Sequence, residues 1–366
     1  MSAKSPPSLY AVDLCAGAGG LSLGASEAGV EIVAAVDHWK PAIDTYSRNF
    51  DHPALDVDLA VEGSEALRRR LGLRTGDLDL LMGGPPCQGF SIQRIGTDTD
   101  HRNDLVLAFA HAVRELGPRL FMMENVRGLL GARGRGHLNR LIAVVTEAGY
   151  RVSVHEVDAS DYGVPQRRKR VFICGARATE EGSFQFPPRL PGRPVTVWDA
   201  IGDLPSPPLD LSPPPDDPLH RRMRLSALNQ ERLRHIPPGG GFEDLPEDLR
   251  VACHRRGASK IGHRYVYGRL APDEPAGTIT ARFDSFTRGK FAHPYEDRNI
   301  TLREGARLQT FPDVHQFVGT QENVAALIGN AVPPKLAVVA CTAARRFLTG
   351  ESLAVESRPS LFDAVA

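Results

Sequence analysis

Strand-like and helix-like segments alternate along the first half of the chain, and this alternation constrains the fold more than any other feature. Short apolar runs typical of buried strands alternate with longer segments whose apolar or small residues recur at helical spacing. The strand-like runs are 8–14, 31–37, 78–82, 119–125, 150–159 and 170–176, and the helix-like segments are 19–29, 41–50, 104–117 and 137–149. Alternating strands and helices predict an α/β domain built on a parallel sheet.

The composition changes near residue 186. The stretches FPPRLPGRPV, LPSPPLDLSPPPDDP and IPPGGG hold many of the chain's 29 prolines and 35 glycines, and the alternation stops there. Helical patterns return at 301–311 and 334–348. We therefore predict a smaller irregular domain at 186–270, placed between the two parts of an α/β domain at 8–185 and 271–348, and a loosely ordered tail at 349–366.

Composition narrows the function classes. The 44 basic and 44 acidic side chains give a formal net charge of zero, so an anionic partner would have to be bound by local patches. The chain has no C-x-x-C pair, and five scattered cysteines predict neither a zinc site nor a disulfide framework. The N-terminus lacks an apolar signal region, and no apolar run approaches the roughly 20 residues of a membrane span. We expect a soluble cytoplasmic protein with no bound metal and no membrane partner.

A glycine-rich turn, DLCAGAGG (13–20), follows the first strand-like run. Such a turn presents backbone N–H groups at a helix start and lets a ligand approach the main chain. Asp37 ends the next strand-like run, where a carboxylate can accept hydrogen bonds from a ribose, and Asp58 could end a third. These residues favour an adenosine-containing cofactor, with a purely structural turn as the alternative. Ser22 stands where the third glycine of G-x-G-x-x-G would be, which argues against a dinucleotide site.

The stretch GGPPCQGFS (83–91) places a lone thiol, Cys87, between glycines and prolines. A free cysteine is often a small buried hydrophobe, but at the end of a strand it can also be a nucleophile. Glu124, in ENV, ends another strand-like run, where open α/β sheets bind ligands; a solvated loop charge is the alternative.

The stretch VPQRRKRVF (164–172) carries four cations in a row. A charge run is usually a solvated face, yet Arg168 and Arg170 would share one face of an extended chain, opposite Arg167 and Lys169. Asn330, in IGNAVPP, is either a simple helix cap or a residue of the same cleft.

Together these blocks are far more specific than any one of them. The chain resembles the C5-cytosine DNA methyltransferase family from about residue 9 to 348. The matching blocks, in the family's order and approximate spacing, are DLCAGAGG, GGPPCQGFS, ENV, VPQRRKR, RLAPDEPAGTIT (269–280), TLREGARLQTFPD (301–313) and GNAVPP. The resemblance implies a Rossmann-like methyltransferase sheet that uses S-adenosyl-L-methionine, with residues 186–270 as the target-recognition domain.

The resemblance also implies the chemistry. The thiolate of Cys87 would add to C6 of a flipped-out cytosine in double-stranded DNA, so that C5 can take the methyl group. Glu124, protonated, would hold N3 of the base, and Arg170 would hold O2. Arg168 would support the loop or a phosphate. The stretch from Gly89 to Asp104 is suited to a lid that closes over DNA.

The cofactor residues follow from the same resemblance. They are Asp13, Leu14, Cys15, Gly17, Gly19, Gly20, Asp37, His38, Asp58, Leu59, Pro85, Asn330 and Val332. Two of them depart from the family pattern. The family usually has Phe at the position of Cys15 and Glu at the position of Asp37, and both changes bear on cofactor affinity. In the predicted recognition domain, RRMR (221–224) and HRR (254–256) are candidates for DNA contacts.

Three other functions remain as alternatives. An RNA enzyme of the same family would carry a Cys-Phe-Thr signature, and this chain has only SFT at 285–287. A catalytically inactive DNA-binding homologue would not need Cys87, Glu124 and Arg170 intact. A nicotinamide-dependent oxidoreductase leaves PPCQGF and QRRKR unexplained. We expect a monomeric modification enzyme, acting either alone or with a cognate restriction endonuclease for the same site.

Overall fold

A seven-stranded sheet organises the first of two compact units. The computed structural model describes residues 8–86, 104–251 and 266–351, and the first unit comprises residues up to 158, 169–190 and those from 331 onward. The strand order is β3-β2-β1-β4-β5-β7-β6. The strands are β1 (Leu9–Leu14), β2 (Val30–Asp37), β3 (Ala54–Asp56), β4 (Leu80–Gly83), β5 (Leu120–Val126), β6 (Tyr150–Asp158) and β7 (Lys169–Arg177).

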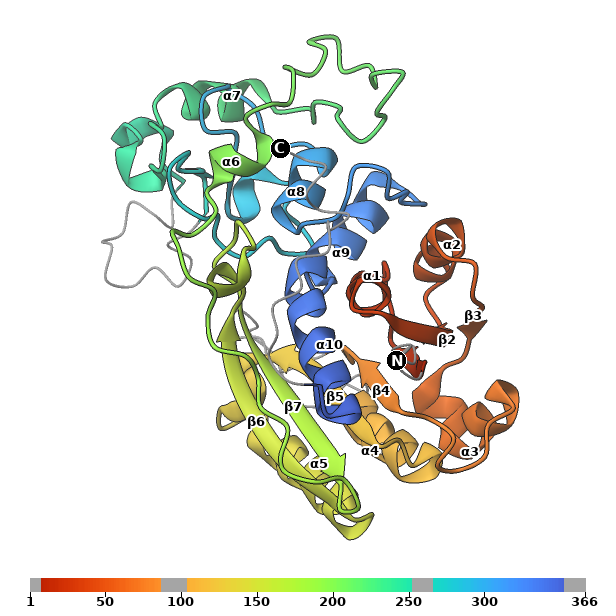
Figure 1. Cartoon of the computed structure of the whole chain (residues 1–366). Helices are drawn as coiled ribbons and strands as arrows, with labels where there is room; N and C mark the ends of the chain where they lie inside the picture. Colours follow the sequence, from red (N-terminus) through yellow and green to blue (C-terminus); the bar gives the residue numbers. More distant parts are fainter. Residues whose placement is uncertain (1–7, 87–103, 252–265, 352–366) are drawn as a thin grey trace, which may run out of the picture. The chain divides into compact units, whose positions relative to one another are not determined.

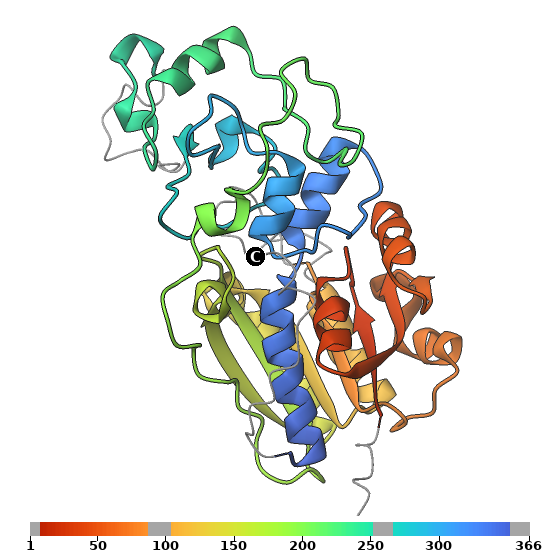
Figure 2. The ribbon, with the colours of Figure 1, turned by 45° about the horizontal axis from the view of Figure 1, so that its top comes forward.

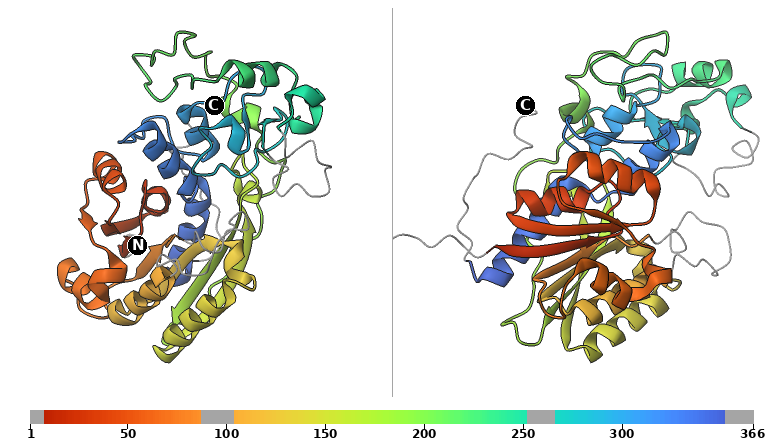
Figure 3. Two further views of the ribbon diagram at one scale, coloured as in Figure 1. Left: turned by 180° about the vertical axis from the view of Figure 1, so that it is seen from behind. Right: turned by 90° about the vertical axis from the view of Figure 1, so that its right-hand side faces the viewer.

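Helices cover both faces of this sheet (Figures 1 and 2). Helices α1 (Gly20–Glu27) and α10 (Pro334–Thr349) pack together on one face, where Gly24 lies so close to α10 that a Cβ there would be 2.3 Å from that of Ala337. Helices α3 (Leu59–Leu71), α4 (Asp104–Leu116) and α5 (Arg135–Glu147) cover the other face (Figure 3). Helix α2 (Lys40–Asn49) carries a proline in its first turn, where proline costs no hydrogen bond.

The apolar periodicity read from the sequence explains the core. Phe109, Phe121 and Tyr150 are buried in one cluster with the apolar side chains of α3, α4 and α5. The ring of Phe121 makes edge contacts with both other rings, at centroid distances of 6.2 and 5.5 Å. Helix α4 ends at Gly117 (φ 57°), and Gly149 (φ 86°) follows the end of α5, as the sequence predicts.

The α/β class is confirmed, but the prediction of a parallel sheet is wrong at one edge. Strand β7 pairs antiparallel with both β5 and β6. Strands β1 to β5 are parallel, because the connections between them carry helices that cross a face of the sheet. Between β6 and β7 the chain has only a single 3₁₀ turn, at Ala159–Tyr162, and no crossover helix, so the second strand returns beside the first.

The second unit comprises residues 159–168 and 191–330. Much of it is irregular, in keeping with its prolines and glycines, and a small cluster around Leu233, Phe242 and Phe286 forms a core of its own. Its regular elements are α6 (Val197–Ile201), α7 (Ala227–Arg234), α8 (Leu302–Leu308), α9 (Gln321–Asn330), and the parallel pair β8 (Gly268–Arg269) and β9 (Lys290–Ala292). The described residues also form 3₁₀ turns at Arg127–Leu130 in the first unit, and at Phe242–Asp244, Glu247–Leu249 and Phe286–Arg288 in the second.

This unit extends beyond the predicted domain at 186–270. It also takes in the helices α8 and α9 and the short crossing at 159–168. The assignment of target recognition to residues 186–270 stays a prediction.

One apolar segment in the described part of the chain, 321–349, is long enough to cross a membrane. It consists of two helices, α9 and α10, separated by a break that includes Pro333. Its most apolar window is 67% buried inside the protein, so the segment belongs to the core.

Candidate active site and cofactor site

The carboxyl ends of β1, β4 and β5 meet at the centre of the sheet. Leu14 pairs with Gly83, and Gly83 pairs with Met123, so three strands end side by side. The strand order reverses between β1 and β4, and open α/β sheets bind ligands at such a switch point. Most of the predicted site residues of the first unit lie at or just beyond these strand ends.

The glycine-rich turn leaves β1 through left-handed backbone. Cys15 (φ 56°), Gly17 (φ 56°) and Gly19 (φ 83°) all have positive φ. At Gly17 an added Cβ would meet nothing within 4 Å, whereas at Gly20 it would lie 2.1 Å from the carbonyl oxygen of Val332. The main chain at Gly17 is therefore accessible, while Gly20 is fixed by close packing.

Asp37 holds this turn in place. Its Oδ2 accepts a hydrogen bond from the backbone N–H of Gly17 at 2.9 Å, and its Oδ1 accepts from the N–H groups of His38 (2.8 Å) and Trp39 (2.9 Å). A carboxylate has about four acceptor positions, so room for a further donor remains. A small hollow beside the carboxylate is lined by Gly17, Asp37 and Tyr46 among others.

The expectation that Asp58 ends a third strand is wrong. Strand β3 ends at Asp56, and Asp58 is the N-cap of α3, where its Oδ1 accepts from the N–H of Ala60 at 3.0 Å. Leu59 is the first residue of that helix and is buried. Aspartate is favoured at this position because its side chain satisfies an N–H that has no partner within the helix.

Asp13 is fully buried beneath the turn. Its Oδ2 accepts from the hydroxyl of Ser22 at 2.7 Å, whereas Oδ1 has no hydrogen-bond partner among the described residues. Burial raises the pKa of Asp13 to about 7, and the nearby charge of Asp37 adds to the effect. Such a carboxyl can respond to a cation bound close by. The accessible main chain, the hollow and this carboxyl together suit a positively charged nucleoside such as S-adenosyl-L-methionine.

The thiols that the structure describes are poorly placed for nucleophilic attack. Burial raises the pKa of Cys15 well above its usual value, and the carboxylates of Asp37, Asp13 and Asp58 raise it further. Burial likewise raises the pKa of Cys174 and Cys341. A thiol with a raised pKa has little thiolate at neutral pH. Cys87 and Cys253 lie outside the described residues.

Glu124 and Arg170 form a buried pair. Their side chains are only 9% and 11% exposed, and Arg170 Nε lies 2.8 Å from Glu124 Oε1. The antiparallel pairing of β5 with β7 sets Arg170 opposite Val126, two residues from Glu124 and thus on the same face of the sheet. Burial lowers the pKa of Arg170, and the charge of Glu124 opposes that shift.

The contact is an ion pair without the alignment of a hydrogen bond. Glu124 Oε1 is buried and accepts no hydrogen bond from the described residues. The NH1 group of Arg170 instead donates to the carbonyl of Lys169 at 2.8 Å. Both partners therefore keep hydrogen-bonding capacity for a third group.

The chain that leads to Cys87 passes beside this pair. The N–H of Gly84 donates to the carbonyl of Leu14 at 3.3 Å, and a Cβ at Gly84 would lie 3.5 Å from Glu124 Oε2. Asn125 donates from Nδ2 to the carbonyl of Pro85 at 3.2 Å, while its Oδ1 accepts from the N–H of Val126. Asn125 was not among the predicted site residues, and its place next to Glu124 was the only sequence signal for it.

In the second unit, Arg168 is a buried residue that connects distant segments of the chain. It is 1% exposed and donates to the carbonyls of Ile279 and Gly329, both at 2.9 Å, and to Oε1 of Gln166 at 3.3 Å. Of its two predicted roles, these contacts agree with support of a loop; they leave no exposed guanidinium for a phosphate. Asn330, the last residue of α9, is exposed, and Val332 is buried.

The predicted alternation along the cation run is confirmed. Arg168 and Arg170 are buried or nearly so, whereas Arg167 and Lys169 are exposed, with Arg167 paired to Glu274 at 2.9 Å. The two buried arginines belong to different units.

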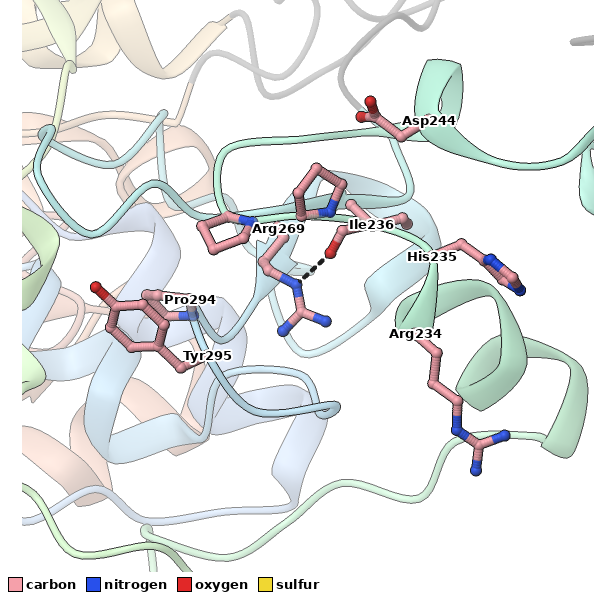
Figure 4. A pocket seen from close by; sticks show the side chains of 9 residues that line it. Arg234, His235, Ile236, Asp244, Arg269, Pro294 and Tyr295 are labelled. Carbon is pink, nitrogen blue, oxygen red and sulfur yellow. Dashed lines mark hydrogen bonds between the residues drawn. The ribbon is translucent and has the colours of Figure 1, made fainter.

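A hollow of about 670 Å³ lies in the second unit, and none of the predicted site residues is among those that line it (Figure 4). Arg269 lines it, but its guanidinium is committed to the carbonyls of Ile236, Leu233, His293 and Glu296 and to the carboxylate of Asp297. Arg269 therefore ties the ends of two loops together.

Arginines of the predicted DNA-contact stretch RRMR differ in their environment. Arg222 pairs with Glu296 at 2.7 Å, while Arg224 is exposed. The other stretch, 254–256, lies outside the described residues, as does the predicted lid except for its last residue, Asp104. Within the described ranges, no cluster of three or more His, Cys, Asp or Glu side chains could hold a metal ion.

Comparisons with known proteins identify the family of the chain. The model of the family described as "C-5 cytosine-specific DNA methylase" matches residues 9–344. The type II methyltransferase M.AgeI of Thalassovita gelatinovora is 31% identical, over 89% of this chain and 96% of the relative. The type II methylase M.HgiDII of Herpetosiphon aurantiacus is 33% identical, over 93% and 96%.

A solved structure shares the fold. A prophage-encoded E. coli protein, named as a DNA modification methyltransferase, superposes with a TM-score of 0.72 at 28% identity, over 93% of this chain and 99% of the other. The chain belongs to the C-5 cytosine-specific DNA methylase family, and it is an S-adenosyl-L-methionine-dependent DNA (cytosine-5-)-methyltransferase.

Proposed function

We propose that Cys87 is the nucleophile of the methyl transfer and that Glu124 and Arg170 hold the target cytosine beside it. The observation that carries the proposal is the placement of Gly84 and Pro85 against Glu124 and Asn125 at the switch point of the sheet. Cys87 follows Pro85 by two residues in the sequence. The raised pKa values of the described thiols leave none of them a comparable nucleophile.

Glu124 and Arg170 divide the recognition of one base edge. A protonated Glu124 would donate to N3 of cytosine and draw electron density from the ring, which favours addition of the thiolate at C6. Arg170 would donate to O2. The buried ion pair keeps both groups oriented before the base arrives.

The cofactor site would be formed by the turn from Asp13 to Gly20 together with Asp37, His38, Asp58, Leu59, Pro85, Asn330 and Val332. S-adenosyl-L-methionine supplies the methyl group. The N–H groups of the turn and the carboxylate of Asp37 would bind its polar parts, and the close packing of Gly20 on Val332 fixes the floor of the site.

We further propose that residues 186–270 read a specific sequence in double-stranded DNA and that the enzyme acts as a monomer in the cytoplasm. The curated relatives are named as type II enzymes, which supports a role in restriction and modification. Arg224, an exposed residue of this segment, is a candidate for a phosphate contact. A cognate endonuclease for the same site would be the partner to look for.

Trapping on 5-fluorocytosine tests the nucleophile. The thiolate can add at C6 and the methyl group can be transferred to C5, but fluorine cannot leave as a cation, so elimination stalls and the protein stays bound to the DNA. We expect a cofactor-dependent band that survives boiling in detergent, with labelled duplex that contains the enzyme's own site. Cys87→Ala should abolish the band.

Cys253→Ala is the matched control, since Cys253 also lies outside the described residues and has no predicted role. It should give a band of parental strength. A full-strength band from Cys87→Ala would show that another thiol is the nucleophile and would overturn the proposal.

A further inference from the structure

A chain of buried polar side chains runs from the floor of the proposed cofactor site toward the surface. Asp13 on β1 accepts from Ser22 on α1, and the Ser22 hydroxyl accepts from the hydroxyl of Tyr46 on α2 at 2.6 Å. The Tyr46 oxygen lies 2.5 Å from Nε2 of His52, which is partly exposed. The sequence motifs indicate no role for Tyr46 or His52, and Ser22 stands out in them only as the residue in place of a third glycine.

Each link of this chain is fixed by packing. Asp13 and Ser22 are fully buried, and Tyr46 is 1% exposed. The ring of Tyr46 stacks on Phe50 at a centroid distance of 4.3 Å, and an added Cβ at Gly19 would collide with Phe50. Tyr46 also lines the hollow beside Gly17 and Asp37. The hydroxyls therefore have little freedom to choose other partners.

We propose that Ser22 and Tyr46 are positioning residues that hold Asp13 as a proton-exchanging carboxyl, so that binding of the sulfonium cofactor releases a proton from it. The inference rests on the proposed placement of the cofactor at this turn. No residue here touches the reacting atoms; the effect acts on cofactor affinity and on its dependence on pH.

The geometry indicates which oxygen carries the proton. Oδ2 already accepts from Ser22, so the proton of the neutral acid resides on Oδ1, the atom that has no partner among the described residues. The groups that act on this carboxyl are Ser22 on α1, Tyr46 on α2, Asp37 on β2, Cys15 in the turn and Cys341 on α10. None of them is a cation, so in the free protein nothing in this set compensates an ionised Asp13.

A cation held by the residues of the turn would reverse that balance. Its positive charge favours the carboxylate, and in a water-poor site the attraction is stronger than in water. When the cofactor binds, the Asp13 carboxyl would lose its proton to solvent, and the carboxylate that remains would compensate the positive charge of the sulfonium. Since the pKa of Asp13 lies at about 7, roughly half of the free protein carries this proton at neutral pH.

Calorimetry of cofactor binding tests the proposal, because it needs neither DNA nor turnover. Titrations with S-adenosyl-L-methionine at pH 7, in buffers of different ionisation enthalpy, should give apparent enthalpies that report release of up to about half a proton. S-adenosyl-L-homocysteine, which has a neutral thioether and the same amino acid end, should release clearly less. Apparent affinity for the sulfonium compound should rise between pH 6 and 8.

Single substitutions distinguish a positioning role of Ser22 and Tyr46 from a role in packing alone. The hydrogen bond from Ser22 lowers the pKa of Asp13, so Ser22→Ala should move the midpoint of proton release to higher pH. Tyr46→Phe keeps the stacked ring and should move it in the same direction by less. Asp13→Asn should abolish the release. Tyr150→Phe is the matched control, since it removes another buried hydroxyl, one that donates to the Pro118 carbonyl.

The possible failures are distinct. Tight binding of S-adenosyl-L-methionine with an enthalpy independent of the buffer would overturn this inference while leaving the proposed function intact. Proton release that survives in Asp13→Asn would assign it to another group. Absence of cofactor binding by the folded parent protein would instead count against the proposed cofactor site itself.

Discussion

At the scale of single residues, the most informative feature is a pair of opposite charges that are buried but not fully satisfied. Glu124 and Arg170 are close enough for an ion pair, yet Glu124 Oε1 accepts no hydrogen bond from any described residue. A buried polar atom left in this state costs stability unless something else uses it. A base edge with acceptors at N3 and O2 would fit the pair if Glu124 is protonated, because the carboxyl would then donate to N3 while Arg170 donates to O2.

Replacement of the Glu124 carboxyl by an amide tests whether Glu124 donates a proton to the base. Glu124→Gln keeps the shape but cannot supply an acidic proton to N3, so formation of the fluorocytosine adduct should slow by about 10²–10⁴-fold. The measurement is the rate of appearance of the detergent-stable band under saturating cofactor. Glu156→Gln, which breaks the exposed pair with Arg127, is the control and should leave the rate unchanged. An equal rate in Glu124→Gln and the parent would remove the acid role from this residue.

At the scale of elements, the sequence predicted which segments are strands and helices but not how side chains lock them together. Apolar periodicity located β1, β2, β4 and β5 because it depends on neighbours along the chain. The reversed direction of β7 depends on the absence of a crossover helix, which periodicity alone does not reveal. Contacts such as that of Asn125 with Pro85, 40 residues away in sequence, arise only when the sheet is assembled.

That contact leads to a prediction about the loop between β4 and α4. Asn125 anchors the carbonyl of Pro85 with its amide and caps its own strand with its amide oxygen. Asn125→Ala should leave the carbonyl without this donor and loosen the start of the segment that carries Cys87. We expect the rate of adduct formation to fall by about tenfold or more, which corresponds to about 1.4 kcal/mol, within the usual worth of one hydrogen bond.

Cofactor affinity separates this effect from general damage. In Asn125→Ala the calorimetric affinity for S-adenosyl-L-methionine should stay close to that of the parent, because the turn from Asp13 to Gly20 is held by Asp37 and Ser22 instead. A variant that loses cofactor binding and adduct formation together would indicate that Asn125 supports the sheet as a whole rather than the loop.

At the scale of the whole molecule, the chain passes several times between its two units. The crossings lie at 158–159, 168–169, 190–191 and 330–331. The sequence placed one boundary near residue 186, close to the crossing at 190–191, but it placed the return to the first unit at residue 271, well before the crossing at 330–331. It did not predict that 159–168 belongs to the second unit, because this segment reads as part of the strand run around it. The contacts of Arg168 explain why the sequence did not reveal this assignment. Its partners Ile279 and Gly329 lie more than 100 residues further along the chain.

The second unit contains a frame of buried contacts that lies outside the segment proposed to read DNA, and this gives the last prediction. The frame includes Arg168, Ile279 and Gly329, all outside residues 186–270. Replacing 186–270 by the equivalent segment of a relative should therefore keep the frame and the chemistry but change the methylated sequence. One condition follows from the structure: the new segment must keep an arginine at 269, since Arg269 binds both Ile236 inside the segment and His293 outside it.

Bisulfite sequencing of DNA from cells that express the chimera is the measurement. The control chimera takes only α5, Arg135–Glu147, from the same relative and should methylate the parental site. An Arg269→Ala version of the first chimera should lose soluble enzyme, because five acceptors would lose their donor at once. If the first chimera is active and still methylates the parental sequence, then target recognition resides outside residues 186–270, and the exposed cations of that segment serve affinity without specificity.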